Sequence, residues 1–143
     1  MNPIEIRAID HVVLRVRDLE RALRFYCDVL HCTEERRLDA LGLVQLRAGA
    51  SLIDLVEISG PLGRTGGGPP GDGARNVDHF AVALATFDEA QIRAHLLRLG
   101  VEPGEVGQRY GAEGTGPSMY IRDPDGNVVE LKGPPNPGHR EGS

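Results

Sequence analysis

Hydrophobic and polar residues follow the same order twice along the chain. In the first half, residues 8–16 are rich in Val, Ile and Leu and predict a strand, and Asp18 has the position of a helix N-cap. Apolar residues then recur at helical spacing, at Leu19, Ala22, Leu23, Tyr26, Cys27 and Leu30. Three further strands are predicted, at residues 33–38, 43–48 and 51–58. The first half is therefore predicted to be a βαβββ module.

The second half repeats this order after a segment rich in glycine and proline. Residues 60–75 are predicted to be a flexible linker without regular structure. Thr86 and Glu89 have capping-box spacing, and the helix they open has an apolar face of Phe87, Ala90, Ala94 and Leu97. Strands are expected at residues 101–107, 118–122 and 127–132.

These patterns predict a single α+β domain of two βαβββ modules. The modules span residues 6–59 and 76–132, and residues 133–143 are expected to form a flexible tail. A duplication of this kind allows a pseudo-twofold axis, with the helix-free faces joined into one curved mixed sheet around a cleft. The chain of 143 residues is long enough to bury a substantial core.

Charge and composition exclude several classes of partner. The formal charge of −5 has the wrong sign for binding a nucleic-acid backbone, and no segment concentrates basic residues. No apolar run approaches the roughly 20 residues that span a bilayer, and the N-terminus has no signal-peptide pattern, so a cytoplasmic protein without membrane contact is expected. Cys27 and Cys32 are expected to be free thiols.

Candidate chemistry lies at equivalent positions of the two modules. Each copy places a histidine on its first strand, His11 or His79, and an acid on its last strand, Asp54 or Glu130. Because side chains alternate across a strand, all four are expected on the face away from the helices. Two imidazoles with one or two carboxylates suit a single divalent ion, Zn²⁺, Ni²⁺, Mn²⁺ or Fe²⁺. The competing interpretation is that they are ordinary strand histidines and solvated acids.

These motifs resemble the vicinal oxygen chelate superfamily, which includes glyoxalase I, extradiol dioxygenases, fosfomycin-resistance enzymes and bleomycin-binding proteins. The matching stretches are Ile9–Leu14 with Asp18–Leu19 and Phe25–Tyr26, Val77–Val82, and Tyr120–Leu131. The resemblance implies paired βαβββ modules with His11, His79 and Glu130 at the metal positions. Asp54 falls where glyoxalase I-like members place a glutamate that is both ligand and base. Asp54, or Glu130 if it is released from the metal, is therefore the candidate catalytic residue that moves a proton.

The resemblance also implies candidate substrate contacts. Ser118 and Tyr120 match polar pocket positions of fosfomycin-resistance enzymes, and Arg109, Arg15 and Tyr120 are candidates for holding an anionic or polar substrate. Val13 replaces a hydroxyl residue of those enzymes, and the loop at Arg109 lacks their lysine.

Three functions remain open on this sequence. The first is a glyoxalase-like metalloenzyme, a lyase, isomerase or transferase, that chelates adjacent oxygens of a small polar molecule. The second is a metal-free protein that binds a drug or metabolite, as bleomycin-resistance proteins do. The third is a ring-cleavage dioxygenase, although no candidate for its additional acid/base histidine is evident. A homodimer is expected, with the site either within one chain or across two.

Overall fold

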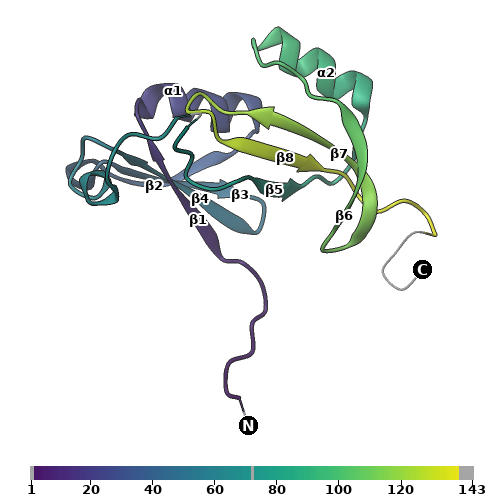
Figure 1. Ribbon diagram of the computed structural model, residues 1–143, viewed down its shortest axis with the longest axis horizontal. Helices are drawn as coiled ribbons and strands as arrows, with labels where there is room; N and C mark the ends of the chain where they lie inside the picture. Colours follow the sequence, from purple (N-terminus) through teal and green to yellow (C-terminus); the bar gives the residue numbers. More distant parts are fainter. Residues whose placement is uncertain (1, 72, 139–143) are drawn as a thin grey trace. The chain divides into compact units, whose positions relative to one another are not determined.

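The structure, a computed structural model, describes residues 2–71 and 73–138 (Figure 1). The chain divides into two compact units, Met1–Pro70 and Gly71–Ser143. Among the described residues, no helix is long and apolar enough to span a membrane. The two units have the same order of strands, so each is described in turn.

Unit 1 is a four-stranded mixed sheet. Its elements are β1 (His11–Val16), α1 (Leu19–Leu23), the π-helical turns Arg24–Val29, β2 (Thr33–Leu38), the 3₁₀ turn Asp39–Leu41, β3 (Leu43–Ala48) and β4 (Ser51–Glu57). The strand order is β1-β4-β3-β2, with β1 parallel to β4 and the other pairs antiparallel. The predicted cap is confirmed, because the Asp18 carboxylate accepts a hydrogen bond from the Arg21 backbone N–H.

Unit 2 repeats that arrangement. Its elements are β5 (Phe80–Ala83), α2 (Glu89–Arg98), β6 (Val106–Gly111), β7 (Gly114–Arg122) and β8 (Val128–Lys132). The strand order is β5-β8-β7-β6, again with the first and last strands parallel. The predicted α+β class and the repeated module are therefore confirmed, and in both units the last strand lies between the first strand and the third.

The second helix differs from its prediction in start and in phase. Its N-cap is Asp88 rather than Thr86, because the Asp88 carboxylate accepts from the Gln91 N–H. Leu97 is 61% exposed whereas Leu96 is fully buried. The inward stripe therefore runs through the partly buried Ile92 and the buried Leu96, one turn apart, and Figure 1 shows α2 lying along one side of β7.

Three segments differ from their predictions: the linker and the start of the tail are more regular than expected, and strand β6 begins later. The linker holds a 3₁₀ turn at Gly63–Gly66, because the Arg15 guanidinium donates to the carbonyls of Gly63 and Gly67 and fixes the loop. Strand β6 begins at Val106, so residues 101–105 are not part of it. Residues 133–136 are bonded along β7, with the Gly133 N–H donating to the Pro117 carbonyl. Residues 139–143 of the predicted tail lie outside the described residues.

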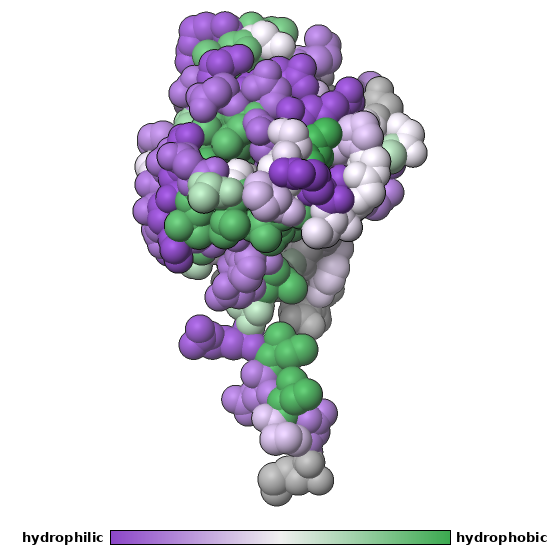
Figure 2. Space-filling model, turned by 90° about the vertical axis from the view of Figure 1, so that its left-hand side faces the viewer, coloured by the Kyte–Doolittle hydropathy of each residue, from purple (hydrophilic) through white to green (hydrophobic). Residues whose placement is uncertain are grey.

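The N-terminal segment before β1 is extended and exposes apolar side chains. Ile4, Ile6 and Ile9 are each at least 72% exposed, and Figure 2 shows this apolar material along the segment at the lower end of the view. The segment contrasts with β1 itself, where Leu14 and Val16 are completely buried.

Candidate functional site

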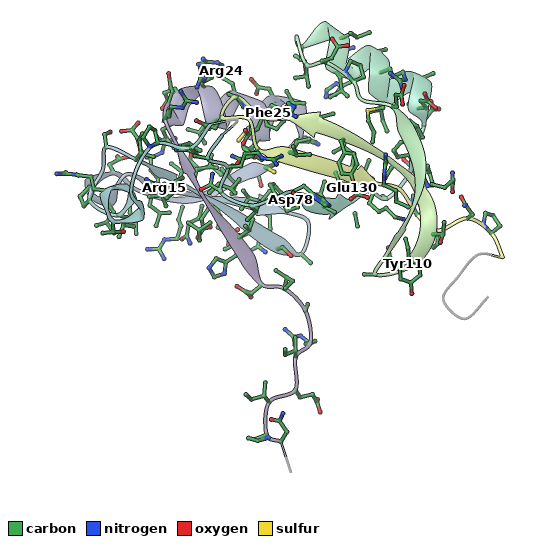
Figure 3. The ribbon with its side chains drawn as sticks, in the orientation of Figure 1. Arg15, Arg24, Phe25, Asp78, Tyr110 and Glu130 are labelled. Carbon is green, nitrogen blue, oxygen red and sulfur yellow. The ribbon has the colours of Figure 1, made fainter. Side chains whose placement is uncertain are left out.

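The histidine and the acid of unit 2 meet on neighbouring parallel strands. His79 directly precedes β5, and Glu130 lies on β8 opposite Ala81. The His79 Nε2 atom is 3.4 Å from Glu130 Oε1, and the Glu130 side chain is 9% exposed. Figure 3 labels Glu130 on β8 and Asp78 at the start of β5. The repeated strand order therefore brings together two residues that are 51 positions apart.

The backbone leading into His79 is anchored by the turn that precedes β8. The Asp123 carboxylate accepts hydrogen bonds from the backbone N–H groups of Asp125 and Asn127 and from the Asn127 side-chain amide. The side-chain Oδ1 of Asn127 in turn accepts hydrogen bonds from both the backbone N–H and the side-chain amide of Asn76. The Asp-Pro-Asp-Gly-Asn turn thus holds the strand that carries His79 beside the strand that carries Glu130.

Asp78 orients the His79 ring from its other nitrogen. The Asp78 Oδ2 atom is 2.7 Å from His79 Nδ1, and this hydrogen bond holds the pKa of Asp78 below its usual value. An Nδ1–H that donates to Asp78 leaves the Nε2 lone pair directed at the Glu130 carboxylate. Two acceptors at this distance repel unless a proton or a cation lies between them, so the pair is suited to share a positive ion.

Unit 1 holds an equivalent but looser pair. His11 Nδ1 is 2.8 Å from Asp10 Oδ2, as in the second copy. This hydrogen bond is the main reason why the pKa of His11 lies above its usual value. The negative charge of Asp54 also raises that pKa, and partial burial opposes the shift. Asp54 lies on β4 opposite Val13, two residues along β1 from His11.

The Asp54 carboxylate is buried with only one of its oxygens satisfied. Its Oδ2 atom accepts from Gln45 Nε2 at 3.0 Å, across the β3–β4 pair, while Oδ1 has no hydrogen-bond partner. The residue is 4% exposed. A buried carboxylate oxygen without a donor is costly, and a cation or a transferable proton would satisfy it.

Three of the four predicted substrate contacts gather on the His79 side of unit 2. The Tyr120 ring packs edge-on against His79 with centroids 5.3 Å apart, and Tyr120 is opposite Glu130 in register. The Arg109 guanidinium lies 4.3 Å from the Tyr120 ring centroid and donates to both the hydroxyl and the carbonyl of Ser118. The fourth, Arg15, lies in unit 1, where it holds the 63–67 loop (labelled in Figure 3).

Each unit supplies part of a ligand set that suits a divalent ion. Two ligands bound at about 2.1 Å and about 109° apart are roughly 3.4 Å from each other, the spacing that tetrahedral zinc geometry gives. The His79–Glu130 distance matches this value. Among the described residues, no three His, Cys, Asp or Glu side chains gather as a metal-binding group within one unit. Each unit thus supplies a pair of candidate ligands.

Comparison with known proteins assigns the chain to a family. A family model described as Glyoxalase/Bleomycin resistance protein/Dioxygenase superfamily matches residues 8–131. The chain belongs to this superfamily. The match includes His11, Asp54, His79 and Glu130, and it covers the strands of both units up to Leu131 of β8. The superfamily resemblance that the sequence motifs indicated is therefore confirmed.

Individual relatives differ in function and length. The chain is 32% identical over 133 residues to virulence protein STM3117 of Salmonella typhimurium, covering 88% of this chain and 83% of that protein. It is 28% identical over 124 residues to a catechol-2,3-dioxygenase of Bacillus subtilis, covering 86% of this chain. The chain spans only 40% of the length of that dioxygenase.

Solved structures of superfamily members share the fold. The crystal structure of STM3117 matches with a TM-score of 0.72 at 28% identity, covering 92% of this chain and 99% of that one. A point mutant of the fosfomycin resistance protein FosX of Listeria monocytogenes matches with a TM-score of 0.65 at 20% identity, covering 90% of each chain, in a complex with Mn(II) and 1S,2S-dihydroxypropylphosphonic acid. At that identity the FosX likeness shows the fold alone.

The sequence did not assign roles to three polar residues of the site. Asp10 and Asp78 precede the histidines in both copies, so the repeated Asp-His pair was the available signal. Gln45 carried no such signal, because its contact with Asp54 depends on the β3–β4 register.

Proposed function

We propose that this protein is a divalent-metal-dependent enzyme of the glyoxalase-like type, acting on a small polar substrate that presents adjacent oxygens. The observation that carries the proposal is the 3.4 Å approach of His79 Nε2 to the buried Glu130 carboxylate, with Nδ1 of the same ring held by Asp78. Histidine and carboxylate ligands with a carboxylate hydrogen-bonded behind the histidine are typical of such metal centres.

The residues of both repeats have distinct roles in this proposal. His11, His79 and Glu130 would hold the ion, and Asp54 is a fourth ligand or the base. A divalent ion bound by few protein groups would polarise adjacent substrate oxygens and stabilise developing negative charge. The unpartnered Oδ1 of Asp54 is suited to accept a substrate proton, because Gln45 fixes the other oxygen.

Substrate orientation is assigned to the polar side chains of unit 2. Arg109 is fixed between Ser118 and the Tyr120 ring before any substrate binds. Its guanidinium would therefore lose little conformational entropy when it contacts a substrate. A lyase, isomerase or transferase reaction is compatible with these groups. Mn²⁺ is the first metal to test, because FosX binds it on the same fold, and Zn²⁺, Ni²⁺ and Fe²⁺ follow from the ligand types.

Metal analysis of tag-free protein tests the proposal. We expect about one divalent ion per chain, and its loss in His11→Ala, His79→Ala and Glu130→Ala. His95→Ala is the matched control, since His95 lies on α2 and pairs with Arg98 instead. If all three site variants keep the metal content of the parent, the proposed metal site is wrong. If the parent itself holds no divalent ion, the enzyme proposal fails and a metal-free binding protein becomes the better description. Oxygen consumption with catechol and Fe²⁺ tests the dioxygenase alternative, which the Bacillus subtilis relative suggests.

A further inference from the structure

Lys132 is the only lysine of the chain, and the roles above leave it unused. It lies on β8 two residues after Glu130, so the two side chains share one face of the sheet. Strand geometry puts their Cα atoms roughly 7 Å apart. Ser118 on β7 and Ala83 on β5 are its direct neighbours in register. The lysine therefore stands on the face that carries the proposed metal ligands.

The Lys132 side chain is buried and poorly satisfied. The residue is 8% exposed, and its Nζ donates to the Gly133 carbonyl at 3.1 Å. An ammonium group has three donors, and among the described residues no carboxylate forms an ion pair with it. Burying a charge beside a single neutral acceptor costs free energy unless a further partner is supplied. An anion is the partner that would supply it.

Two glycines leave the space through which this side chain runs. A Cβ added to Gly111 would lie 3.2 Å from Lys132 Cε, and one added to Gly116 would lie 3.2 Å from Nζ. The lysine thus extends from β8 across β7 towards β6. Arg109 on β6 is opposite Gly116 in register, and Lys132 on β8 is opposite Ser118, two residues further along β7, so the two cationic side chains start on either side of the same stretch of β7.

Arg109 adds a second cation with capacity to bind. Its Nη1 donates to the two oxygens of Ser118, and no described carboxylate pairs with its guanidinium. Lys132 and Arg109 carry two positive charges against the one negative charge of Glu130 on the same sheet face, and neither forms an ion pair with it, so the face keeps a net positive charge. An oxyanion would reduce their mutual repulsion and take up the free N–H donors of both.

We propose that Lys132 and Arg109 form an oxyanion-binding site on the β5–β8 face, which receives a carboxylate or phosphate group of the substrate. This inference rests on the proposed function for its assignment to a substrate, but the binding of an anion does not depend on metal. The proposed anion site narrows the substrate class to molecules that carry an anionic group a few bonds away from the adjacent oxygens that the metal would chelate.

The single lysine makes a direct test available. Labelling with ¹³C-lysine gives one Cε resonance, which needs no assignment. In metal-free full-length protein we expect inorganic phosphate to shift this resonance saturably. Losing a charged hydrogen-bond donor costs about 1.5–3 kcal/mol, so Lys132→Met should weaken phosphate binding measured by calorimetry about ten- to hundredfold. Arg98→Met, which removes an exposed cation from α2, should leave it within twofold of the parent.

The possible outcomes separate this inference from the metal proposal. A lysine resonance that stays fixed up to about 10 mM phosphate, ten times a weak Kd of about 1 mM, would overturn the anion site. Equal weakening by Lys132→Met and Arg98→Met would also overturn it, since net charge would then explain the binding. If the parent protein holds no metal but His79→Ala still binds phosphate, the anion site is supported and only the metal proposal is rejected.

Discussion

Replacing Asp78 by alanine should weaken metal binding without unfolding the protein. Its carboxylate is 2.7 Å from His79 Nδ1, and the side chain is 84% exposed. Removing a carboxylate that orients a metal-ligating histidine typically weakens affinity 10–100-fold, or about 1.4–2.7 kcal/mol. Water reaches Asp78 and can replace part of the lost bond, so we expect a loss of about tenfold, at the lower end of that range.

Because Asp78 is exposed, its replacement should affect metal affinity without affecting the free energy of unfolding. Surface substitutions usually change the free energy of unfolding by less than about 0.5 kcal/mol, so Asp78→Ala should unfold at the same denaturant concentration as the parent. Competition with a chromophoric chelator gives the metal affinity, and ¹⁵N NMR of the metal-free histidines gives the tautomer. In the parent, His79 should carry its proton on Nδ1, and Asp78→Ala should lose this preference.

Two further variants distinguish orientation from charge. Asp78→Asn keeps an acceptor oxygen, so it should retain the tautomer and lose less affinity than Asp78→Ala. Glu113→Gln removes one exposed charge from the same unit and should bind metal like the parent. Unchanged affinity in Asp78→Ala, or an equal loss in Glu113→Gln, would refute the idea that the Asp-His pair prepares the ligand. Asp10 should repeat the Asp78 result at His11.

Three other predictions concern stability and reactivity. Leu96→Ala should lower the unfolding free energy by about 2–5 kcal/mol, whereas Leu97→Ala, its exposed neighbour, should change it by less than about 0.5 kcal/mol; similar values in urea titrations would contradict the phase of α2. Burial raises the pKa of Cys32 to about 11 from its reference of 9.0, so the thiol should resist alkylation at pH 8 until the protein is unfolded. Because the folded state favours the protonated thiol, stability should fall as pH rises from 9 to about 11, and a flat profile in this window would contradict the shift. Gln45→Leu should cost about 1–3 kcal/mol by leaving the buried Asp54 carboxylate without a donor, whereas Gln45→Leu with Asp54→Leu should cost less than the single change in a double-mutant cycle.

Strand positions were predictable where turn signals bound them on both sides. Strand β3 matches the predicted residues 43–48, because turns containing Gly42 and Gly49 set its two ends, and Gly49 has the positive φ of 61° that its turn requires. Strand β2 matches the predicted residues 33–38, with the turn at Gly42 following its end. The phase of α2 was wrong because its apolar residues allow two stripes. The predicted stripe of alanines and Leu97 has more members than the stripe of Ile92 and Leu96. Ile92 and Leu96 have larger side chains than the alanines, however, and turning them inward buries more apolar surface.

For the candidate ligand pairs, the sequence predicted which face of the sheet each side chain is on, but not which residues are in contact. Alternation along each strand placed His79 and Glu130 on the helix-free side, but their contact depends on β8 pairing with β5. Sequence patterns do not state which strands are neighbours, and the duplication supplied that information only indirectly. The Gln45 contact and the burial of Lys132 depend on register and on glycine positions in other strands, so the sequence alone did not reveal them.

The two repeats carry a histidine and an acid at equivalent strand positions, but the surroundings of these residues differ. Glu130 lies against its histidine at 3.4 Å, whereas Asp54 carries a shorter side chain and is held by Gln45 from the neighbouring strand. A carboxylate that keeps one oxygen fixed and the other unpartnered is better arranged to move a proton than one directed at a histidine. The cationic pair of Lys132 and Arg109 occurs on the unit 2 sheet, whereas the Arg15 guanidinium of unit 1 bonds to the 63–67 loop. The repeated strand order therefore accounts for the proposed ligand pairs, and the differences between the units assign the proposed base to unit 1 and the proposed anion site to unit 2.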